Sequence, residues 1–517
     1  AMKRIKWILF MVWLFIATTE MVAQKRDTLP LLSRSLEHAT TDVAMLRYYH
    51  ENVALHHLLY PSSLSTFGTE YHWRHENRAF LQQNGSGESL THIYANTYLK
   101  PSESQHMWGN ATYSSGLIKG VRFNSTSDFA RLYPYMVADA EGGNLSHERY
   151  AFGGGYSGAY HQWRLAGEVQ YLSQQEYRRV DPRPRNIVSN LTMNMGVAHP
   201  LGSYIVGVSL GHEIYKQRSS VAFYSPLGTT IQWLMNGLGG SFARFNTNTP
   251  TVYYRGYGLS SAAHLVPSGV EGFSAKIGYQ YHRLEETLTD MNEVPIHHYN
   301  DHRVEVALGY LWQGTCQQGV ELKAEIQNRK GVEHIVGEPA AGTYPVIGEL
   351  PNFYFPHYKG TLAWHVGRSE GGVNWHLSPT LSYRYLAIRK LEPKSLLQSQ
   401  RWQVALSGFG SYQIDKASYI ALSCNIGYSP LGKGELSLSH TTLKEELSRE
   451  VRHSFATINA TQLFFEVAPK WHYTIQGWGS LPWGIEVGGR YRFGRYSGGG
   501  VDAIHRHWVE GVIQLLF

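Results

Sequence analysis

The sequence lacks long hydrophobic runs. Beyond the N-terminal region, no stretch reaches about 18 consecutive apolar residues, the length at which a membrane-spanning helix becomes a candidate. The mean hydropathy of the 517 residues is negative, at −0.31. These two absences exclude a helical membrane protein, which needs several such runs.

The sequence also has little net charge and little cysteine. A net charge of +6 is small for 517 residues, so the composition gives no reason to expect nucleic acid as a partner. Its two cysteines are Cys316, in a turn-like segment, and Cys424, on an alternating apolar face. Although export would permit a disulfide, these positions favour two unpaired thiols.

Sequence motifs for cofactors are missing as well. The chain has no P-loop, no dinucleotide-binding motif in the required context, no His-Glu-x-x-His and no EF-hand loop. We therefore expect no cofactor.

Tyrosine, tryptophan and glycine are abundant instead. The chain contains 35 Tyr, 14 Trp, 19 Phe and 52 Gly, although only 43% of its residues are hydrophobic. This combination is typical of a transmembrane β-barrel, which needs aromatic girdles at both membrane surfaces, tight bends and a polar lumen.

Apolar and polar residues alternate along many segments. Alternation at a period of two is the mark of a β-strand with two different faces. Clear examples are 163–171, 303–312, 319–326 and 402–412. We count about 18 such segments, within a range of 14–20. The prediction is an all-β fold, namely a transmembrane antiparallel β-barrel with a polar lumen.

Both ends of the sequence point to export. Near the start, three basic residues precede an apolar run over 7–17, which is too short to span a bilayer and which predicts a signal peptide with cleavage after Ala23. The last residues, 508–517, alternate up to the terminal Phe517. They resemble the C-terminal signature of bacterial outer-membrane β-barrels, in which this segment forms the last strand.

The predicted organisation has three parts. Residues 1–23 form a signal peptide for the Sec pathway, 24–60 form an N-terminal segment in the periplasm or in the lumen, and 61–517 form the barrel. The predicted location is the outer membrane of a Gram-negative bacterium, with its lipids as surroundings.

An arginine-rich segment is the first candidate site for a ligand or partner. It contains Arg178, Arg179, Asp181, Arg183 and Arg185 and is stiffened by two prolines. An ordered loop with several guanidinium groups can bind carboxylates or phosphates. The same arginines can equally form ion pairs with aspartates and glutamates of the chain itself.

Three histidines are weak candidates for a metal site. His297, His298 and His302 lie close together in the sequence, and Asp301 adds a carboxylate. Imidazole and carboxylate groups bind zinc and related metals. Their spacing matches no compact metal-binding motif, so a solvated loop is the simpler interpretation and no metal site is predicted.

A Gly-x-Ser-x-Gly motif around Ser209 raises the question of hydrolysis. A nucleophile elbow needs a strand, a sharp turn and a helix, whereas this motif lies within an alternating strand over 204–210. His212, three residues on, faces the opposite side of that strand. Small residues on a lumen-facing surface are the preferred interpretation, and we predict that the protein is not an enzyme.

Two further segments resemble a known family. Residues 127–143 contain Ser-Asp, Leu-Tyr-Pro-Tyr, Asp and Gly-Gly in order, and 177–186 read Tyr-Arg-Arg-Val-Asp-Pro-Arg-Pro-Arg-Asn. Both are similar to segments of a Bacteroidota-type outer-membrane β-barrel family of unknown function. The resemblance extends to 108–113 and, more loosely, to 52–55. It implies an outer-membrane location and frequent association with TonB-dependent transport, with no catalytic residues.

The sequence and the family resemblance suggest three possible functions. The favoured one is a transport or accessory component of a TonB-dependent uptake system, with a TonB-dependent receptor or a surface lipoprotein as partner. The alternatives are a passive outer-membrane pore, which the polar lumen suggests, and a barrel-embedded lipid hydrolase, which Ser209 suggests.

Overall fold

The computed structural model describes most of the chain. The described residues are 29–39, 47–226, 228–245, 247, 249–340, 342–439, 444–475 and 482–517. The predicted signal peptide over 1–23 lies outside them. No helix in the described part of the chain is both long and apolar enough to cross a membrane.

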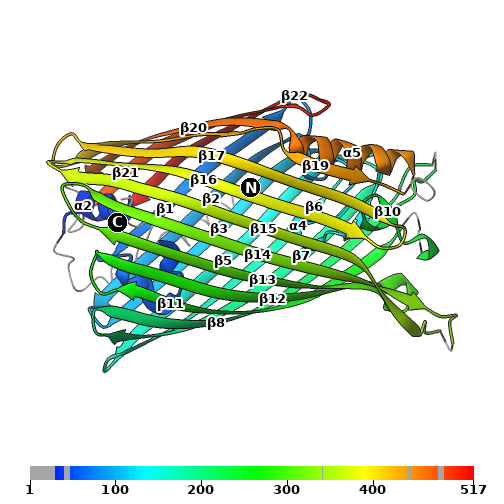
Figure 1. Cartoon of the computed structure of the whole chain (residues 1–517), viewed down its shortest axis with the longest axis horizontal. Helices are drawn as coiled ribbons and strands as arrows, with labels where there is room; N and C mark the ends of the chain where they lie inside the picture. Colours follow the sequence, from blue (N-terminus) through cyan, green and yellow to red (C-terminus); the bar gives the residue numbers. More distant parts are fainter. Residues whose placement is uncertain are drawn as a thin grey trace, which may run out of the picture.

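The chain forms a closed antiparallel β-barrel (Figure 1). Its strands occupy 18 positions: β1 (Leu64–Glu76), β2 (Gly87–Ser102), β3 (Gln105–Val121), β5 (Gly143–Tyr160), β6 (Trp163–Tyr177), β7 (Arg183–Leu201), β8 (Tyr204–Ala222), β11 (Thr251–Pro267), β12 (Gly272–Leu288), β13 (Val294–Trp312), β14 (Gln317–Val336), β15 (Val346–Glu370), β16 (Val373–Lys390), β17 (Ser395–Gln413), β18 (Ser418–Ser429), β20 (Thr461–Ile475), β21 (Trp483–Gly498) and β22 (Val501–Leu516). The short β19 (Lys433–Ser437) continues beyond β18 along the same edge of β17. Pairing of β1 with β22 closes the ring. The predicted fold class and strand number are confirmed.

The outer face of the barrel is apolar because alternate residues point outward. In β13, for example, Leu308 and Tyr310 are exposed, whereas Ala307 and Leu311 on either side of this pair are buried. Aromatic residues form cross-strand pairs on this face, such as half-buried Tyr383 with exposed Trp402, whose ring centroids are 4.8 Å apart. An apolar band with aromatic residues is the surface that a bilayer requires of a barrel.

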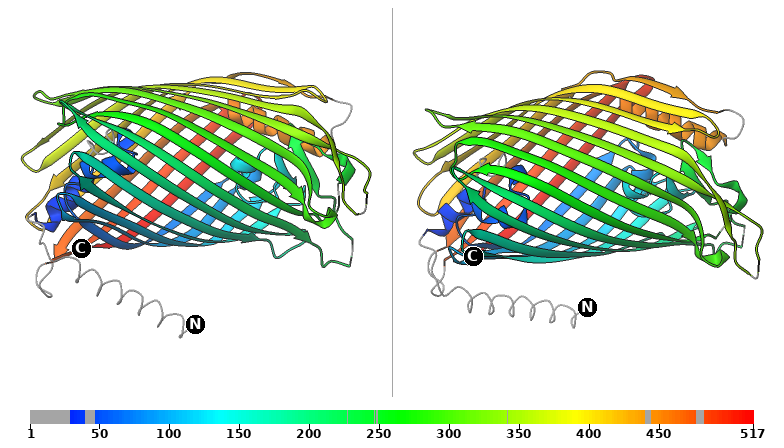
Figure 2. Two further views of the ribbon diagram at one scale, coloured as in Figure 1. Left: turned by 90° about the horizontal axis from the view of Figure 1, so that it is seen from below. Right: turned by 60° about the horizontal axis from the view of Figure 1, so that its bottom comes forward.

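The two ends of the barrel differ in their connections. At one end, short turns such as 103–104, 161–162 and 202–203 join the strands, and the C-terminus and α2 (Leu31–Ala39) lie at this end (Figures 1 and 2). The opposite end carries the long connections and α5 (Glu445–Asn459). Bacterial barrels have short periplasmic turns and longer extracellular loops. We therefore call the end with the short turns the periplasmic end and the opposite end the extracellular end.

Long connections fold into the extracellular mouth. Residues 122–142, the inner loop, contain α4 (Phe129–Leu132) and β4 (Tyr135–Ala138). β4 pairs with β9 (Trp233–Gly237) of the β8–β11 connection, and β10 (Gly240–Ser241) completes a three-stranded sheet. Further short helices in the described part of the chain are η1 (Val53–Leu58), η2 (Gln82–Asn84), η3 (Ala243–Phe245) and η4 (Thr289–Met291).

A hydrophobic core fixes the inner loop to the barrel wall. Leu132, Tyr135 and Leu234 from the connections pack with Tyr254 and Tyr299 from the strands, and all five are at most 2% exposed. Burial of large apolar side chains is the main stabilising contribution to such a contact. The extracellular mouth is thus filled by a folded layer of the chain.

Residues 47–60, just before β1, enter the periplasmic end of the lumen. Tyr49 is fully buried, and its carbonyl oxygen lies 2.8 Å from Nδ1 of His264 on β11. Glu51 forms an ion pair with Lys276 on β12, with 2.5 Å between Oε2 and Nζ. Residues 47–60, which we call the lumen segment, therefore contact strands far along the chain.

Glycines make room for the lumen segment. A Cβ atom on Gly196 would lie 2.0 Å from Oδ1 of Asn52, and one on Gly207 would lie 2.8 Å from its Nδ2. Asn52 is only 1% exposed, and its Oδ1 accepts a hydrogen bond from the backbone N–H of Ala54 at the start of η1.

Cys316 and Cys424 are free, as predicted.

Substituting Gly196 tests this contact. We expect Gly196→Val to displace the lumen segment from the wall, because real side chains do not tolerate a contact of 2.0 Å; overpacking of this kind costs about 1–3 kcal/mol. Hydrogen exchange of the amides in 47–60 should accelerate in the folded barrel. Gly511→Ala is the control, since nothing lies within 4 Å of its added Cβ; equal exchange in both variants would contradict the contact.

Candidate functional site

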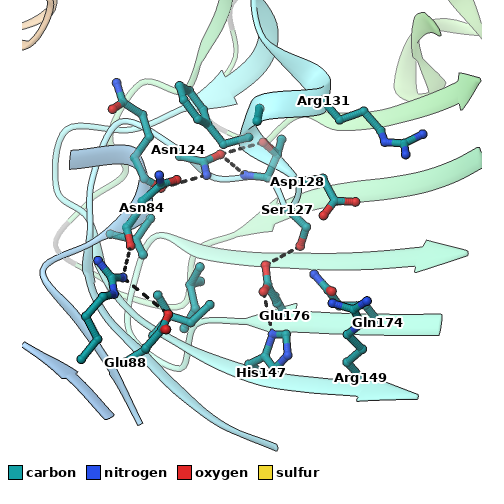
Figure 3. A pocket seen from close by; sticks show the side chains of 18 of the residues that line it. Asn84, Glu88, Asn124, Ser127, Asp128, Arg131, His147, Arg149, Gln174 and Glu176 are labelled. Carbon is teal, nitrogen blue, oxygen red and sulfur yellow. Dashed lines mark hydrogen bonds and ion pairs between the residues drawn. The ribbon is translucent and has the colours of Figure 1, made fainter. Parts of the chain in front are cut away.

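A polar chamber lies beside the inner loop, within the lumen. Its volume is about 790 Å³, and β1, β2, β5, β6 and the inner loop contribute its lining. Ser127 projects from the loop towards Glu176 on β6, which lies beside His147 on β5 (Figure 3). Asp128 and Arg131 of the loop also line the cavity. We call this cavity the loop chamber.

The inner loop is held in place by hydrogen bonds from its own polar side chains. Nδ2 of Asn124 donates to the carbonyl of Gln83 at 3.2 Å, and its Oδ1 accepts from the N–H of Thr126 at 2.9 Å. Asp128 has a left-handed backbone, with φ 52°, and accepts a hydrogen bond from the hydroxyl of Tyr215 at 2.9 Å. Burial raises the pKa of Asp128.

The barrel wall binds the carbonyl groups at the end of α4. Nη1 of Arg329 donates to the carbonyl oxygens of Ala130, Arg131 and Tyr133, at 3.1, 3.2 and 2.5 Å. Cations are favourable at the C-terminal end of a helical turn, where carbonyl groups lack partners. Arg329 is also paired with Asp301, with 2.7 Å between Nη2 and Oδ2.

Glu176 is the centre of a hydrogen-bonded group in the chamber. Its Oε2 accepts from Oγ of Ser127 at 2.5 Å, and its Oε1 lies 2.8 Å from Nδ1 of His147 (Figure 3). All three are buried. A catalytic triad instead needs the imidazole between the serine and the acid. Here the serine donates to the carboxylate, so the arrangement holds the loop against β5 and β6 and prepares no nucleophile.

Charged groups of both signs face the chamber. Arg506 pairs with Glu76, with 2.6 Å between Nε and Oε1, and stacks on Trp508 at 4.3 Å. Nη2 of Arg131 is 2.8 Å from Oε1 of Glu213. Arg149 is exposed and lines the same cavity. With these donors, acceptors and one aromatic face, the chamber can bind a polar solute of a few hundred Å³.

A second polar cavity lies on the other side of Arg131. Its volume is about 540 Å³, and its lining includes Glu213, His282, Asp301 and Arg303. Because Ala130 and Arg131 contribute to both cavities, α4 lies between them.

Of the predicted arginine-rich segment, Arg178 is deeply buried. It is 3% exposed and its Nη1 lies 3.3 Å from Oδ2 of Asp139, which is fully buried. Asp139 also accepts hydrogen bonds from Oγ of Ser125 and the N–H of Gly142, both at 2.6 Å. The two segments that carry the family resemblance are therefore joined by this ion pair.

The other predicted residues of that segment stabilise its own turn or face solvent. Nε of Arg183 lies 2.6 Å from Oδ1 of Asp181, whose Oδ2 accepts from the N–H groups of Tyr224 and Ser225. Arg179 donates to the hydroxyl of Tyr177 at 3.3 Å. Arg185 is exposed.

The structure does not bring the three candidate histidines together. Nδ1 of His297 lies 2.6 Å from Oε2 of Glu286, and its ring stacks on Tyr135 with centroids 4.3 Å apart. His302 lies 2.8 Å from the hydroxyl of Tyr279. His298 instead lies 2.8 Å from His334 on the next strand.

Ser209 lies inside β8, where the sequence places it, and the motif has a packing explanation. The absent side chain at Gly207 leaves room for Asn52. Within the described part of the chain, no hydrogen bond joins Ser209 to a histidine, and His212 contacts the carbonyl of Gly258 at 3.0 Å.

Sequence reasoning missed the residues that form the loop chamber. Ser127, His147, Glu176 and Trp508 come from four separate elements and carry no shared spacing. The one available signal is the presence of charged residues at lumen-facing positions of β5 and β6, which a polar lumen already explains.

Replacing Arg178 tests the ion pair. Arg178→Gln should leave Asp139 as a buried carboxylate without its cation, a loss that typically costs about 3–5 kcal/mol. We expect faster hydrogen exchange and proteolysis of 135–143. The matched control is Arg179→Gln at the neighbouring exposed position, and the same protection in both variants would be inconsistent with a stabilising pair.

Glu450 on α5 gives a test by pH. Its Oε1 accepts from Nε2 of Gln83, a chamber residue, and from Oγ of Ser454, at 2.5 and 2.6 Å. Burial raises the pKa of Glu450, so protonation favours the docked helix. Docking should be strongest below the ordinary carboxyl pKa and weaken as pH rises through the raised pKa.

The readout is the protection of amides in α5, corrected for the intrinsic effect of pH on exchange. Glu450→Gln should remove most of the pH dependence, because the amide keeps the acceptor oxygen and has no proton to lose. Glu446→Gln, at an exposed position of the same helix, should behave as wild type. An unchanged pH profile in the Glu450 variant would refute the assignment.

Comparisons with known proteins place the chain in a family. A search of curated protein sequences gave no match. Among solved structures, the siderophore receptor PiuA from Acinetobacter baumannii has a TM-score of 0.40 at 7% identity, covering 88% of this chain and 82% of that one. A ferric enterobactin receptor (PfeA) mutant from Pseudomonas aeruginosa gives 0.38 at 8%, covering 88% and 80%, and the copper transporter OprC gives 0.37 at 7%, with the same coverage. The model of a family of unknown function, DUF6850, matches residues 53–517, and the chain belongs to this family.

Proposed function

We propose that this protein is an outer-membrane uptake component of a Gram-negative bacterium, working as an accessory subunit beside a TonB-dependent transporter. The observation that carries the proposal is that the chain fills its own lumen at both ends. The inner loop packs into the extracellular mouth with a hydrophobic core, and the lumen segment packs into the periplasmic end.

The filled lumen supports a gated or accessory role over a passive pore. An open pore needs a continuous water-filled path, whereas Arg329, Tyr299 and the Glu176 group all bind the inner loop to the wall. The alternative of a lipid hydrolase has less support, because neither Ser209 nor Ser127 is hydrogen-bonded to a histidine in the described part of the chain.

A protruding hairpin supports contact with a partner. β15 is 25 residues long and, with β14, extends beyond the neighbouring strands at the extracellular end (Figure 1). Near its tip, Ile335, Val346 and Ile347 are exposed apolar residues, with Ile347 67% exposed. Apolar side chains gathered on an extramembrane surface mark a protein interface. The resemblance of the inner loop and the 177–186 segment to barrels associated with TonB-dependent transport favours a partner from that system.

The test is affinity purification of tagged protein from native outer membranes in mild detergent, followed by quantitative mass spectrometry. We expect a TonB-dependent receptor or a surface lipoprotein in stoichiometric amount with the wild type, and strong loss of it with Ile347→Glu, because a charge in an apolar contact is costly.

Val180→Glu is the matched control, since Val180 is 72% exposed on a different extracellular connection. It should retain the partner. A wild-type barrel that is recovered alone, with no protein in comparable amount, would overturn the accessory role.

A further inference from the structure

Three side chains on adjacent strands bring metal-binding atoms together near the tip of the protruding hairpin. They are His298 on β13, His334 on β14 and Glu349 on β15. Their ligand atoms lie within 4.8 Å of one another. Nδ1 of His298 and Nε2 of His334 are 2.8 Å apart, and Nε2 of His334 is 3.9 Å from Oε1 of Glu349.

The pairing of the strands creates this arrangement. His334 is the direct partner of Glu349 across β14 and β15. A register shift between Gly331 and Val332 changes the alignment of β14 with β15 just before the His334–Glu349 pair. Three residues that are far apart in the sequence, on strands joined by two hairpins, therefore converge on one spot.

The hydrogen bonds of His334 fix which of its nitrogens is free to bind. Nδ1 lies 2.9 Å from the carbonyl oxygen of Pro295. A carbonyl oxygen only accepts, so Nδ1 carries the proton and Nε2 carries a lone pair directed at His298. Donation of one ring N–H to a backbone carbonyl is the usual way in which proteins orient a metal-binding histidine.

We propose that His298, His334 and Glu349 bind a divalent transition-metal ion of the zinc type. Two imidazole nitrogens and one carboxylate oxygen form a ligand set that suits Zn²⁺. This site is independent of the proposed accessory function, since it rests on the side chains alone.

The geometry needs only a small adjustment to accept the ion. Tetrahedral coordination with metal–nitrogen distances of about 2.0–2.1 Å separates two nitrogens by about 3.3 Å. The two rings must therefore move apart by about half an ångström. Both histidines are buried, at 4% and 5% exposure, and so are held in place. The Glu349 side chain is 59% exposed, which leaves the fourth position open to water.

The site stands apart from the other histidines of this region. His297 is paired with Glu286, and His302 contacts Tyr279. A bound metal ion would link β13, β14 and β15 next to the 337–345 connection between β14 and β15. It would thereby hold the hairpin that carries Val346 and Ile347 in one orientation.

The experiment is calorimetric titration of Zn²⁺ into the full chain, folded in detergent micelles and purified without a histidine tag. We expect a tight step of one ion per chain, above a weak background from the many other histidines. A parallel titration with Co²⁺ should give the visible absorption of a tetrahedral ion.

Two variants and one control define the outcome. His334→Gln should weaken the tight step at least about tenfold and abolish the Co²⁺ spectrum. Glu349→Gln, which changes a side chain that is 59% exposed, should also weaken it. His302→Gln, on the same strand as His298, should match the wild type. A wild type without the tight step, or one whose affinity survives both variants, would overturn the proposal.

Discussion

The structure depends on one constraint, namely that every backbone N–H and C=O group within a bilayer must find a partner in the protein. An open sheet would leave two edges unpaired. Pairing of Thr66–Glu76 in β1 with Arg506–Leu516 in β22 removes both edges. Closure in turn forces one face of every strand towards lipid and the other into the lumen. The alternating sequence, the aromatic pairs on the outer face and the charged residues inside are consequences of that single closure.

A closed barrel of this size encloses more space than its wall residues fill, and the chain uses its own connections to fill it. The filling differs at the two ends. At the extracellular mouth the inner loop contributes a true hydrophobic core around Leu132 and Tyr135. At the periplasmic end the lumen segment forms a smaller hydrophobic cluster around Tyr49 and Leu55. Polar contacts, such as Glu51 with Lys276, and glycines that permit close approach add to it. The polar chambers lie beside the inner loop, bounded by ion pairs such as Arg506 with Glu76.

The fold could be predicted from the sequence because each strand carries its own signal: alternation is local, and the number of alternating segments gave the number of strands. The sites could not be predicted in this way. Arg178 stood out as a charged loop residue, but its partner Asp139 lies 39 residues earlier, and only the folded inner loop buries the pair. Likewise, His298 was visible beside His297 and His302, yet its neighbour His334 lies on the next strand and comes close only through the pairing of β13 with β14. Such features arise from tertiary geometry that no local pattern encodes.

The position of the lumen segment has a consequence for assembly. This segment precedes β1, but the wall that it contacts includes Gly196 on β7, Lys276 on β12 and Glu305 on β13. Its docking site is complete only after more than half of the chain has been incorporated into the barrel wall. A segment that precedes the first strand in the sequence is thus among the last to reach its final place. Its burial therefore depends on a finished wall, and an incomplete barrel would leave those residues without their contacts.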